Sequence, residues 1–345
     1  MTARFSTAMA LVSILSLVAC DSAEVPASAT TAAARTPARD ASDASDPIEV
    51  PDAYEAGTMV TLAKLAPQNT TGLHNVFELS DSIISGSEPH GEAAFEDLAA
   101  RGVKVILSVD GKIPDAELAA RHGMRYVHVP IRYSGMSEEQ LEHIAKTFRD
   151  LDGPFYVHCF HGKHRGPAAA AVGRIVRDGV PRTQALAEMR QWCGTSKKYG
   201  GLYRLIATRA MPTSAETDAS SWQFDAAYQV DGIASAMVAI PRTFDNLKDL
   251  AKRNFAVDPE HPDIDAANEA AQLHQLMQAA CDLEETRESP DDFRGWMSAS
   301  RDESKALHDL LVRVGNGDQA AIAEAGEAVG RVGSLCDACH VPYRN

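Results

Sequence analysis

The hydrophobic pattern divides the chain into two parts with different periods. Between about residues 60 and 210, short β-rich apolar runs alternate with amphipathic segments of helical period. The apolar runs lie at 75–78 with 82–84, 103–109, 126–131 and 155–159, and the helical segments lie near 93–101, 115–122, 138–151, 166–177 and 182–191. Strands that alternate with helices predict an α/β domain over residues 59–212, with a mostly parallel sheet flanked by helices.

The rest of the pattern, from about residue 222, is helical throughout. Segments of helical period lie at 222–253, 265–285 and 292–314, and Asp318 is placed to cap one more helix. In that last helix the inward positions recur at steps of three and four, at Ile322, Ala325, Val329, Val332, Cys336 and Cys339. The pattern predicts an all-α four-helix bundle over residues 222–345, joined to the α/β domain by a polar linker at 213–221. Pro241 is expected to kink or locally break the first helix.

The N-terminus has the pattern of an export signal. Arg4 precedes an apolar run at 8–19 that is too short for a comfortable membrane span. The run ends in Leu-Val-Ala-Cys, which resembles the lipobox of bacterial lipoproteins and implies a signal peptide at 1–19 and lipidation of Cys20. Residues 20–58 are rich in Ala, Ser, Thr, Asp and Pro and predict a disordered tether. The resemblance implies a periplasmic protein held by its lipid anchor alone, and Asp21 favours the inner membrane of a Gram-negative cell.

The charge balance narrows the class of partners. The chain holds 48 acidic and 33 basic residues, for a formal net charge of −15. A protein of this charge is repelled by the phosphate backbone, so we expect no nucleic-acid partner. Simple solubility explains the charge.

The C-terminus carries a second kind of chemistry. Cys336-Asp337-Ala338-Cys339-His340 is a CxxCH motif, the attachment pattern for c-type haem. Two thiols three positions apart lie on one face of a helix and can both add to haem vinyl groups, while His340 ligates the iron. A redox CxxC or half of a zinc site are the alternatives, but the chain has no second such cysteine pair.

The helical pattern together with CxxCHxxYR resembles cytochrome c′, over residues from about 222 to the end. The motif stands here as Cys336, Cys339, His340, Tyr343 and Arg344. The resemblance implies one covalently bound haem c with His340 as axial ligand, a redox partner or small gas ligand, and a homodimer through the bundle. In that family the distal position is empty or filled by methionine. Met237 is a candidate distal ligand and equally a candidate core residue.

The stretch VHCFHGKHRGP, at 157–167, lies between an apolar strand and an alanine-rich helix. Ligands of open α/β sheets bind at the carboxyl ends of strands, and a helix N-terminus favours an anion. His158-Cys159 followed at position 165 by arginine gives the spacing HC-x5-R. Amides of residues 160–165 would surround an oxyanion, Arg165 would grip two of its oxygens, and the positive surroundings would favour a Cys159 thiolate. A zinc site made by Cys159 and the nearby histidines is an alternative with poor spacing.

This stretch resembles the phosphate loop of protein tyrosine and dual-specificity phosphatases, most closely their small bacterial members. The segments ISGSEP, at 84–89, and GTSKKYGGLYR, at 194–204, strengthen the likeness. The resemblance implies hydrolysis of a phosphorylated small molecule or phosphoprotein through a phosphocysteine on Cys159. The phosphate-binding residues it implies are Phe160, His161, Gly162, Lys163, His164 and Arg165.

The chain departs from that family at two positions. The loop where the general-acid aspartate is expected reads Arg132-Tyr133-Ser134, with no carboxylate before Glu138. The hydroxyl residue that follows the arginine is replaced by Gly166. Asp110 reaches the same sheet edge and is the candidate substitute acid. An anion-binding domain without efficient turnover, attached to an electron-transfer or gas-binding cytochrome, is therefore the alternative function.

Two further cysteines bear on the site. Cys193 could pair with Cys159 in an oxidising compartment, or be a buried thiol like Cys281.

Overall fold

The computed structural model describes residues 46–259 and 261–343. The predicted signal peptide, Cys20, Asp21, the tether up to residue 45 and Arg344 lie outside the described residues. In the described ranges, no helix combines the length and the apolar character that a membrane span requires.

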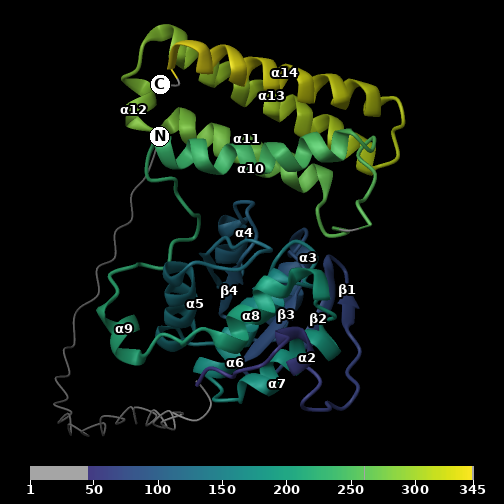
Figure 1. Ribbon diagram of the computed structural model, residues 1–345, viewed down its shortest axis with the longest axis vertical. Helices are drawn as coiled ribbons and strands as arrows, with labels where there is room; N and C mark the ends of the chain where they lie inside the picture. Colours follow the sequence, from purple (N-terminus) through teal and green to yellow (C-terminus); the bar gives the residue numbers. More distant parts are fainter. Residues whose placement is uncertain (1–45, 260, 344–345) are drawn as a thin grey trace, which may run out of the picture. The chain divides into compact units, whose positions relative to one another are not determined.

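The first part of the described chain holds a mixed sheet flanked by helices (Figure 1), as the sequence predicts. Its strands are β1 Gln68–Thr70, β2 Leu73–Glu78, β3 Ile83–Gly86, β4 Val105–Ser108, β5 Arg125–His128 and β6 Phe155–His158. They lie in the order β1-β2-β3-β6-β4-β5. The pairs β3–β6, β6–β4 and β4–β5 are parallel, while β1–β2 and β2–β3 are antiparallel. β6 is thus a central strand, and its carboxyl end opens onto the middle of the sheet edge.

Helices bury both faces of this sheet. The helices and helical turns are α2 Ala53–Ala56, α3 Glu92–Ala100, α4 Ala116–Arg121, α5 Glu138–Asp150, α6 Arg165–Val176, α7 Arg182–Ala187, η1 Glu188–Trp192, η2 Lys197–Tyr199, α8 Gly200–Thr208 and α9 Ser214–Ala219. On one face Phe95 and Leu98 of α3 pack with Leu118 of α4. On the other, α5, α6, α7 and α8 share the larger core. The predicted linker contains α9, which begins at a capping box formed by Thr213 and Glu216.

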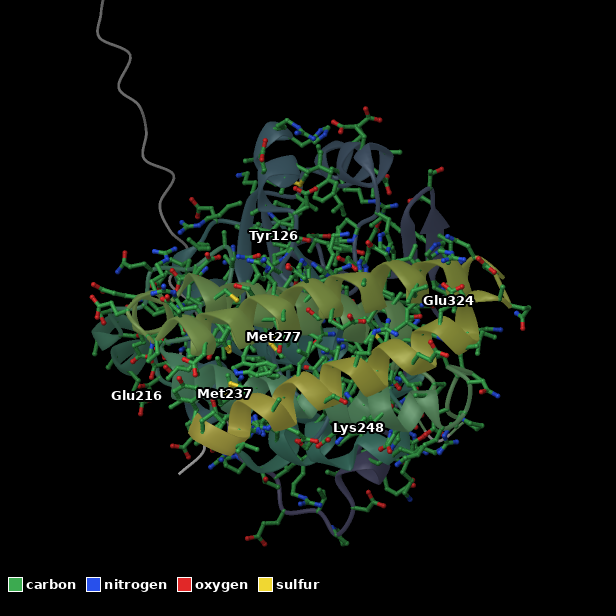
Figure 2. The ribbon with its side chains drawn as sticks, turned by 90° about the horizontal axis from the view of Figure 1, so that it is seen from above. Tyr126, Glu216, Met237, Lys248, Met277 and Glu324 are labelled. Atoms are coloured by element: carbon green, nitrogen blue, oxygen red, sulfur yellow. The ribbon has the colours of Figure 1, made fainter. Side chains whose placement is uncertain are left out.

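The C-terminal part is a helical region. Its helices are α10 Ile233–Ala251, α11 Ala266–Asp282, α12 Glu284–Arg287, α13 Asp291–Gly315 and α14 Ala321–Tyr343. The long helices share one core, which includes Leu247, Leu273, Leu307 and Val332. Figure 2 labels Met277 within this core and Met237 on α10, and both pack against it. The helical class of this region agrees with the periodicity of its sequence.

The first helix differs from its prediction in two ways. It continues through Pro241 without a break, so the expected local break is wrong. It also begins at Ile233, not near residue 222. The preceding segment binds the α/β part instead, because the amide of His128 donates to the carbonyl oxygen of Asp225 at 2.8 Å and Trp222 stacks on His143 at 4.2 Å between ring centroids. In a helix, the carbonyl oxygen of Asp225 would instead accept from an amide four residues further along the chain.

Candidate functional site

The loop after β6 is shaped by hydrogen bonds to its carbonyl groups. Glu88 N–H donates to the carbonyl oxygen of Phe160 at 3.0 Å, Asn75 Nδ2 to that of His161 at 2.9 Å, and Thr195 Oγ1 to that of Lys163 at 2.7 Å. Asn75 lies on β2 and the other two partners lie in neighbouring loops, and together they hold these carbonyl groups away from Cys159. Among the described residues, none accepts a hydrogen bond from the backbone N–H groups of residues 160–164. The loop therefore presents unpaired amide donors next to Cys159, which is buried.

Gly162 is required by this loop. Its φ is +72°, and a Cβ built there would lie 2.3 Å from the carbonyl carbon of Gly86. Both the left-handed backbone and the contact with β3 exclude a side chain. The sequence prediction that this position belongs to a tightly curled loop agrees with this geometry.

Arg165 begins α6 and lies over the loop, with 4% of its surface exposed. Its Nη2 donates to Asp110 Oδ2 at 2.6 Å and to Tyr133 Oη at 2.9 Å. The guanidinium also lies 4.2 Å from the centre of the Tyr133 ring. Its Nε is buried and has no acceptor in the described part of the chain. The Nε donor of the guanidinium thus remains for a ligand, while Asp110 and Tyr133 accept from Nη2.

His158, before the cysteine, is a buried neutral imidazole. Burial lowers its pKa to about 3. Its Nε2 lies 2.8 Å from the hydroxyl of Tyr126, which Figure 2 labels, and its Nδ1 lies 3.4 Å from the carbonyl oxygen of Cys159. The residue orients the end of β6 and adds no charge there.

The other two histidines of the loop, His161 and His164, are neutral and so add no positive charge to it. Burial lowers the pKa of His164 to about 4 and lowers that of His161. The Nδ1 of His164 accepts from Ser196 N–H at 3.2 Å. Lys163 is exposed, and Phe160 lies beneath the ammonium group of Lys112 at 5.7 Å. The loop binds an anion mainly through its amides and Arg165.

The two departures from the phosphatase pattern lie where the sequence places them. Ser134 borders the cavity beside Arg165, and no carboxylate is present in the segment 132–137. A Cβ on Gly166 would lie 3.1 Å from the backbone nitrogen of Cys159, so this position is tightly packed. Asp110 is at the sheet edge, but the charge of Arg165 and a hydrogen bond from Lys112 N–H lower its pKa although burial opposes this. Asp110 is therefore an ionised partner of Arg165 in this conformation.

The helical region contributes residues that the sequence did not reveal. This region and the α/β part belong to one compact unit. Asp263, before α11, lies with its Oδ1 at 3.7 Å from His164 Nε2 and accepts a short hydrogen bond from Tyr199. From α11, Asn268 Nδ2 donates to Asp110 Oδ1 at 3.3 Å, and Gln275 Oε1 accepts from Ile113 N–H at 2.7 Å. No local sequence signal marks these residues, because the partners of Asp263 lie at least 64 positions away and those of Asn268 and Gln275 lie 158 and 162 positions away.

A cavity of about 590 Å³ lies at this edge of the sheet. Its wall combines the loop after β5 with α10 and α11. Lining residues include Gly111, Tyr133, Ser134, Arg165, Arg242, Asn246, Glu269 and Gln272. A phosphate ester bound at the loop would extend into this space.

The CxxCH residues lie together near the end of α14. Cys336 is half-buried and packs against the helical core, Cys339 is buried, and both are free thiols. The side chain of His340, on α14, makes no hydrogen bond or ion pair with any described residue. Cys159, Cys193 and Cys281 are also free thiols.

The zinc alternative finds no geometric basis. Across residues 46–259 and 261–343, no three side chains of His, Cys, Asp or Glu are grouped as metal ligands.

Similarity to known proteins is confined to weak structural likeness. No protein-family model and no curated protein matches the chain. Among solved structures it resembles TpbA of P. aeruginosa, with 22% identity over 45% of this chain and 90% of that chain and a TM-score of 0.32. It also resembles the core catalytic domain of the PP-IP phosphatase SIW14 of S. cerevisiae, with 18% identity, 42% and 86% coverage and a TM-score of 0.33. It also resembles human DUSP28, with 19% identity over 41% of this chain and 97% of that chain and a TM-score of 0.32.

Proposed function

We propose that the α/β part hydrolyses phosphate monoesters through a phosphocysteine on Cys159. The observation that carries this proposal is the loop 160–164, whose carbonyl groups are held outward while its amide donors and Arg165 Nε have no partner in the described residues. Such a ring of donors fits the oxygens of a phosphoryl group. The substrate is a phosphorylated small molecule or a phosphoprotein.

The chemistry has two steps. The Cys159 thiolate attacks phosphorus, an S–P bond forms, and the P–O bond to the departing oxygen breaks. That oxygen takes a proton as it leaves. Water then attacks the phosphocysteine, the S–P bond breaks, and inorganic phosphate leaves with the thiolate restored. Arg165 and the loop amides stabilise the charge that spreads over the equatorial oxygens in both steps.

The test is turnover of an aryl phosphate together with trapping of the phosphocysteine by acid quench. Cys159→Ser should lower turnover at least roughly 10³-fold while leaving tungstate binding intact, because the cradle does not need the sulfur. Cys281→Ser, which removes a half-buried thiol of α11, is the matched control and should retain activity.

A second candidate function is oxyanion binding without efficient turnover. It is favoured by the missing carboxylate in segment 132–137. If the wild type binds tungstate but turns over no aryl phosphate at any pH and forms no phosphocysteine, this second function replaces the first.

We also propose that Cys336 and Cys339 attach one haem c and that His340 ligates its iron. The residues fit such a group, since both thiols are free on the inward side of α14 and His340 has no competing partner among the described residues. A bound haem would supply redox or gas-binding chemistry. Met237, half-buried on α10, is the candidate distal ligand.

The haem proposal is tested by expression with haem maturation. Covalent haem should survive denaturation in the wild type and be lost in Cys336→Ala/Cys339→Ala, while Cys281→Ala keeps it. Absorption spectra of Met237→Ala then decide its role, because loss of a methionine ligand changes the spectrum whereas loss of a core residue does not.

The location of the protein is a third proposal. Lipidation at Cys20 would hold it in the periplasm at the inner membrane, and Cys20→Ala should release it to the soluble fraction.

Homodimerisation through the helical region is a further proposal, and light scattering of the purified protein tests it.

A further inference from the structure

The proposed hydrolysis needs a proton for the departing oxygen, and the usual loop does not supply it. Ser134 occupies that place at the cavity, and the nearby Asp110 is ionised beside Arg165. For a leaving group that is a poor anion, the absence of a proton donor costs roughly 10²–10⁴-fold in rate. The donor must therefore come from another element of the cavity wall.

Helix α11 turns a polar face toward the sheet edge. Asn268, Glu269 and Gln272 are 4%, 5% and 8% exposed. Gly111 permits this approach, because a Cβ there would lie 2.0 Å from Gln272 Oε1. Such burial of polar side chains is costly unless they have partners.

Partners are missing for several of these atoms. Asn268 Oδ1, Gln272 Nε2 and Arg165 Nε are buried and have no hydrogen-bond partner in the described part of the chain. Gln272 and Arg165 both line the cavity. Two orphaned donors on residues that line one cavity, Gln272 Nε2 and Arg165 Nε, indicate a polar ligand that touches α11 as well as the loop.

Glu269 lies in the same wall. Its Oε2 accepts from Asn246 Nδ2 at 2.9 Å, and no described group donates to its Oε1. The charged groups that act on it are Arg165, Asp110 and Asp265. Other charged or titratable residues of the same cavity are Arg132, Arg242, Asp249, Arg253, Asp258 and His261.

Its protonation state suits a donor. Burial raises the pKa of Glu269 to about 7, against the lowering effects of Asn246 and Arg165. A Glu269 carboxyl group with this raised pKa can hold a proton near neutral pH. His164 and Tyr133 do not suit the role of a proton donor near neutral pH, because the pKa of His164 is lowered to about 4 and that of Tyr133 is raised well above 10.

We infer that Glu269, contributed by α11, is the proton donor to the departing oxygen of the phosphate ester. The inference rests on the proposed hydrolysis. As the P–O bond breaks, the carboxyl O–H of Glu269 transfers its proton to the leaving oxygen, which departs as a neutral alcohol. The resulting carboxylate accepts a proton from the water that attacks the phosphocysteine, so the donor is restored.

The experiment compares two esters with the full-length protein. Phenyl phosphate needs protonation of its leaving oxygen, whereas p-nitrophenyl phosphate departs as a stable anion. Glu269→Gln should lose roughly 10²-fold in kcat/KM on phenyl phosphate and much less on p-nitrophenyl phosphate, because kcat/KM reports the step in which the leaving oxygen departs and not the later hydrolysis that both esters share. The decline of wild-type kcat/KM on phenyl phosphate above pH 7 should disappear in the variant.

The matched control is Glu303→Gln, which removes a carboxylate of the helical region that pairs with Arg331 at 2.8 Å. It should leave both esters and the pH profile unchanged. Equal loss of kcat/KM in Glu269→Gln on both esters, or no loss on either, overturns the inference while leaving the hydrolysis intact. A wild type that forms no phosphocysteine overturns the hydrolysis itself and the inference with it.

Discussion

At the scale of single residues, the site depends on glycines as much as on charged groups. Gly162 lets the loop pass against Gly86, and Gly111 lets Gln272 reach the sheet edge. A side chain at either position would separate elements that must touch. The HC-x5-R spacing predicts the curled loop, but it does not reveal which neighbour the loop touches.

Gly162→Ala should therefore disable the loop. The added methyl would press on the carbonyl carbon of Gly86 in a left-handed backbone, so the loop must open. We expect at least a roughly 10²-fold loss in kcat/KM and destabilisation of about 1–3 kcal/mol, seen in aryl phosphate turnover and thermal unfolding.

Gly179→Ala provides the control, because Gly179 also has a positive φ, +66°, but a Cβ there meets nothing within 4 Å. Gly179→Ala therefore shows the effect of backbone strain alone, without a steric clash of the kind that Gly162→Ala makes with Gly86. Equal loss of turnover in both variants would mean that the contact with Gly86 is unimportant.

At the scale of elements, most helices and strands follow from periodicity, and the exceptions have tertiary causes. The strand-to-helix turn at Cys159 and the inward seam of α14 lie where the pattern predicts them. The segment before Ile233 is not helical, since its backbone binds His128. Asn268, Glu269 and Gln272 of α11 are buried, and only the fold brings Asn268 to Asp110. Half of the candidate site was thus outside the reach of sequence patterns.

The buried carboxyl of α11 should make stability depend on pH. Because the pKa of Glu269 is raised to about 7 in the folded protein, its neutral form is favoured there, and stability falls as pH rises from the unfolded value of 4.5 through 7. Glu269→Gln, which mimics the neutral form, should gain roughly 2 kcal/mol over the wild type between pH 5 and pH 8.

The measurement is thermal or denaturant unfolding of both proteins across that range. Glu303→Gln should track the wild type at every pH. A constant difference between wild type and Glu269→Gln would show that Glu269 does not bind a proton on folding.

At the scale of the whole molecule, the proposed haem and the phosphate loop are joined through α10 and α11. Asn246 of α10 binds Glu269, and Met237, the candidate distal ligand, lies on the same helix. A change of ligation at the haem that moves α10 would therefore alter the position or the pKa of Glu269.

We expect turnover of phenyl phosphate to differ at least about 5-fold between the oxidised, reduced and NO-bound protein, which is the usual size of coupling between two sites. Turnover of p-nitrophenyl phosphate serves as the control for the loop itself. Identical rates on phenyl phosphate in all three states would contradict the coupling.

The hydrogen bond between Asn268 and Asp110 has a consequence for how the protein can change over generations. The residues proposed to bind the anion lie before residue 212, whereas Glu269, the proposed proton donor, lies after residue 260. Loss or replacement of the helices would leave a receptor that holds oxyanions without consuming them. Conversely, a substitution at Glu269 alone would change the rate and leave the anion-binding loop intact, whereas a change at Asn268, which binds Asp110 beside Arg165, would alter anion binding as well.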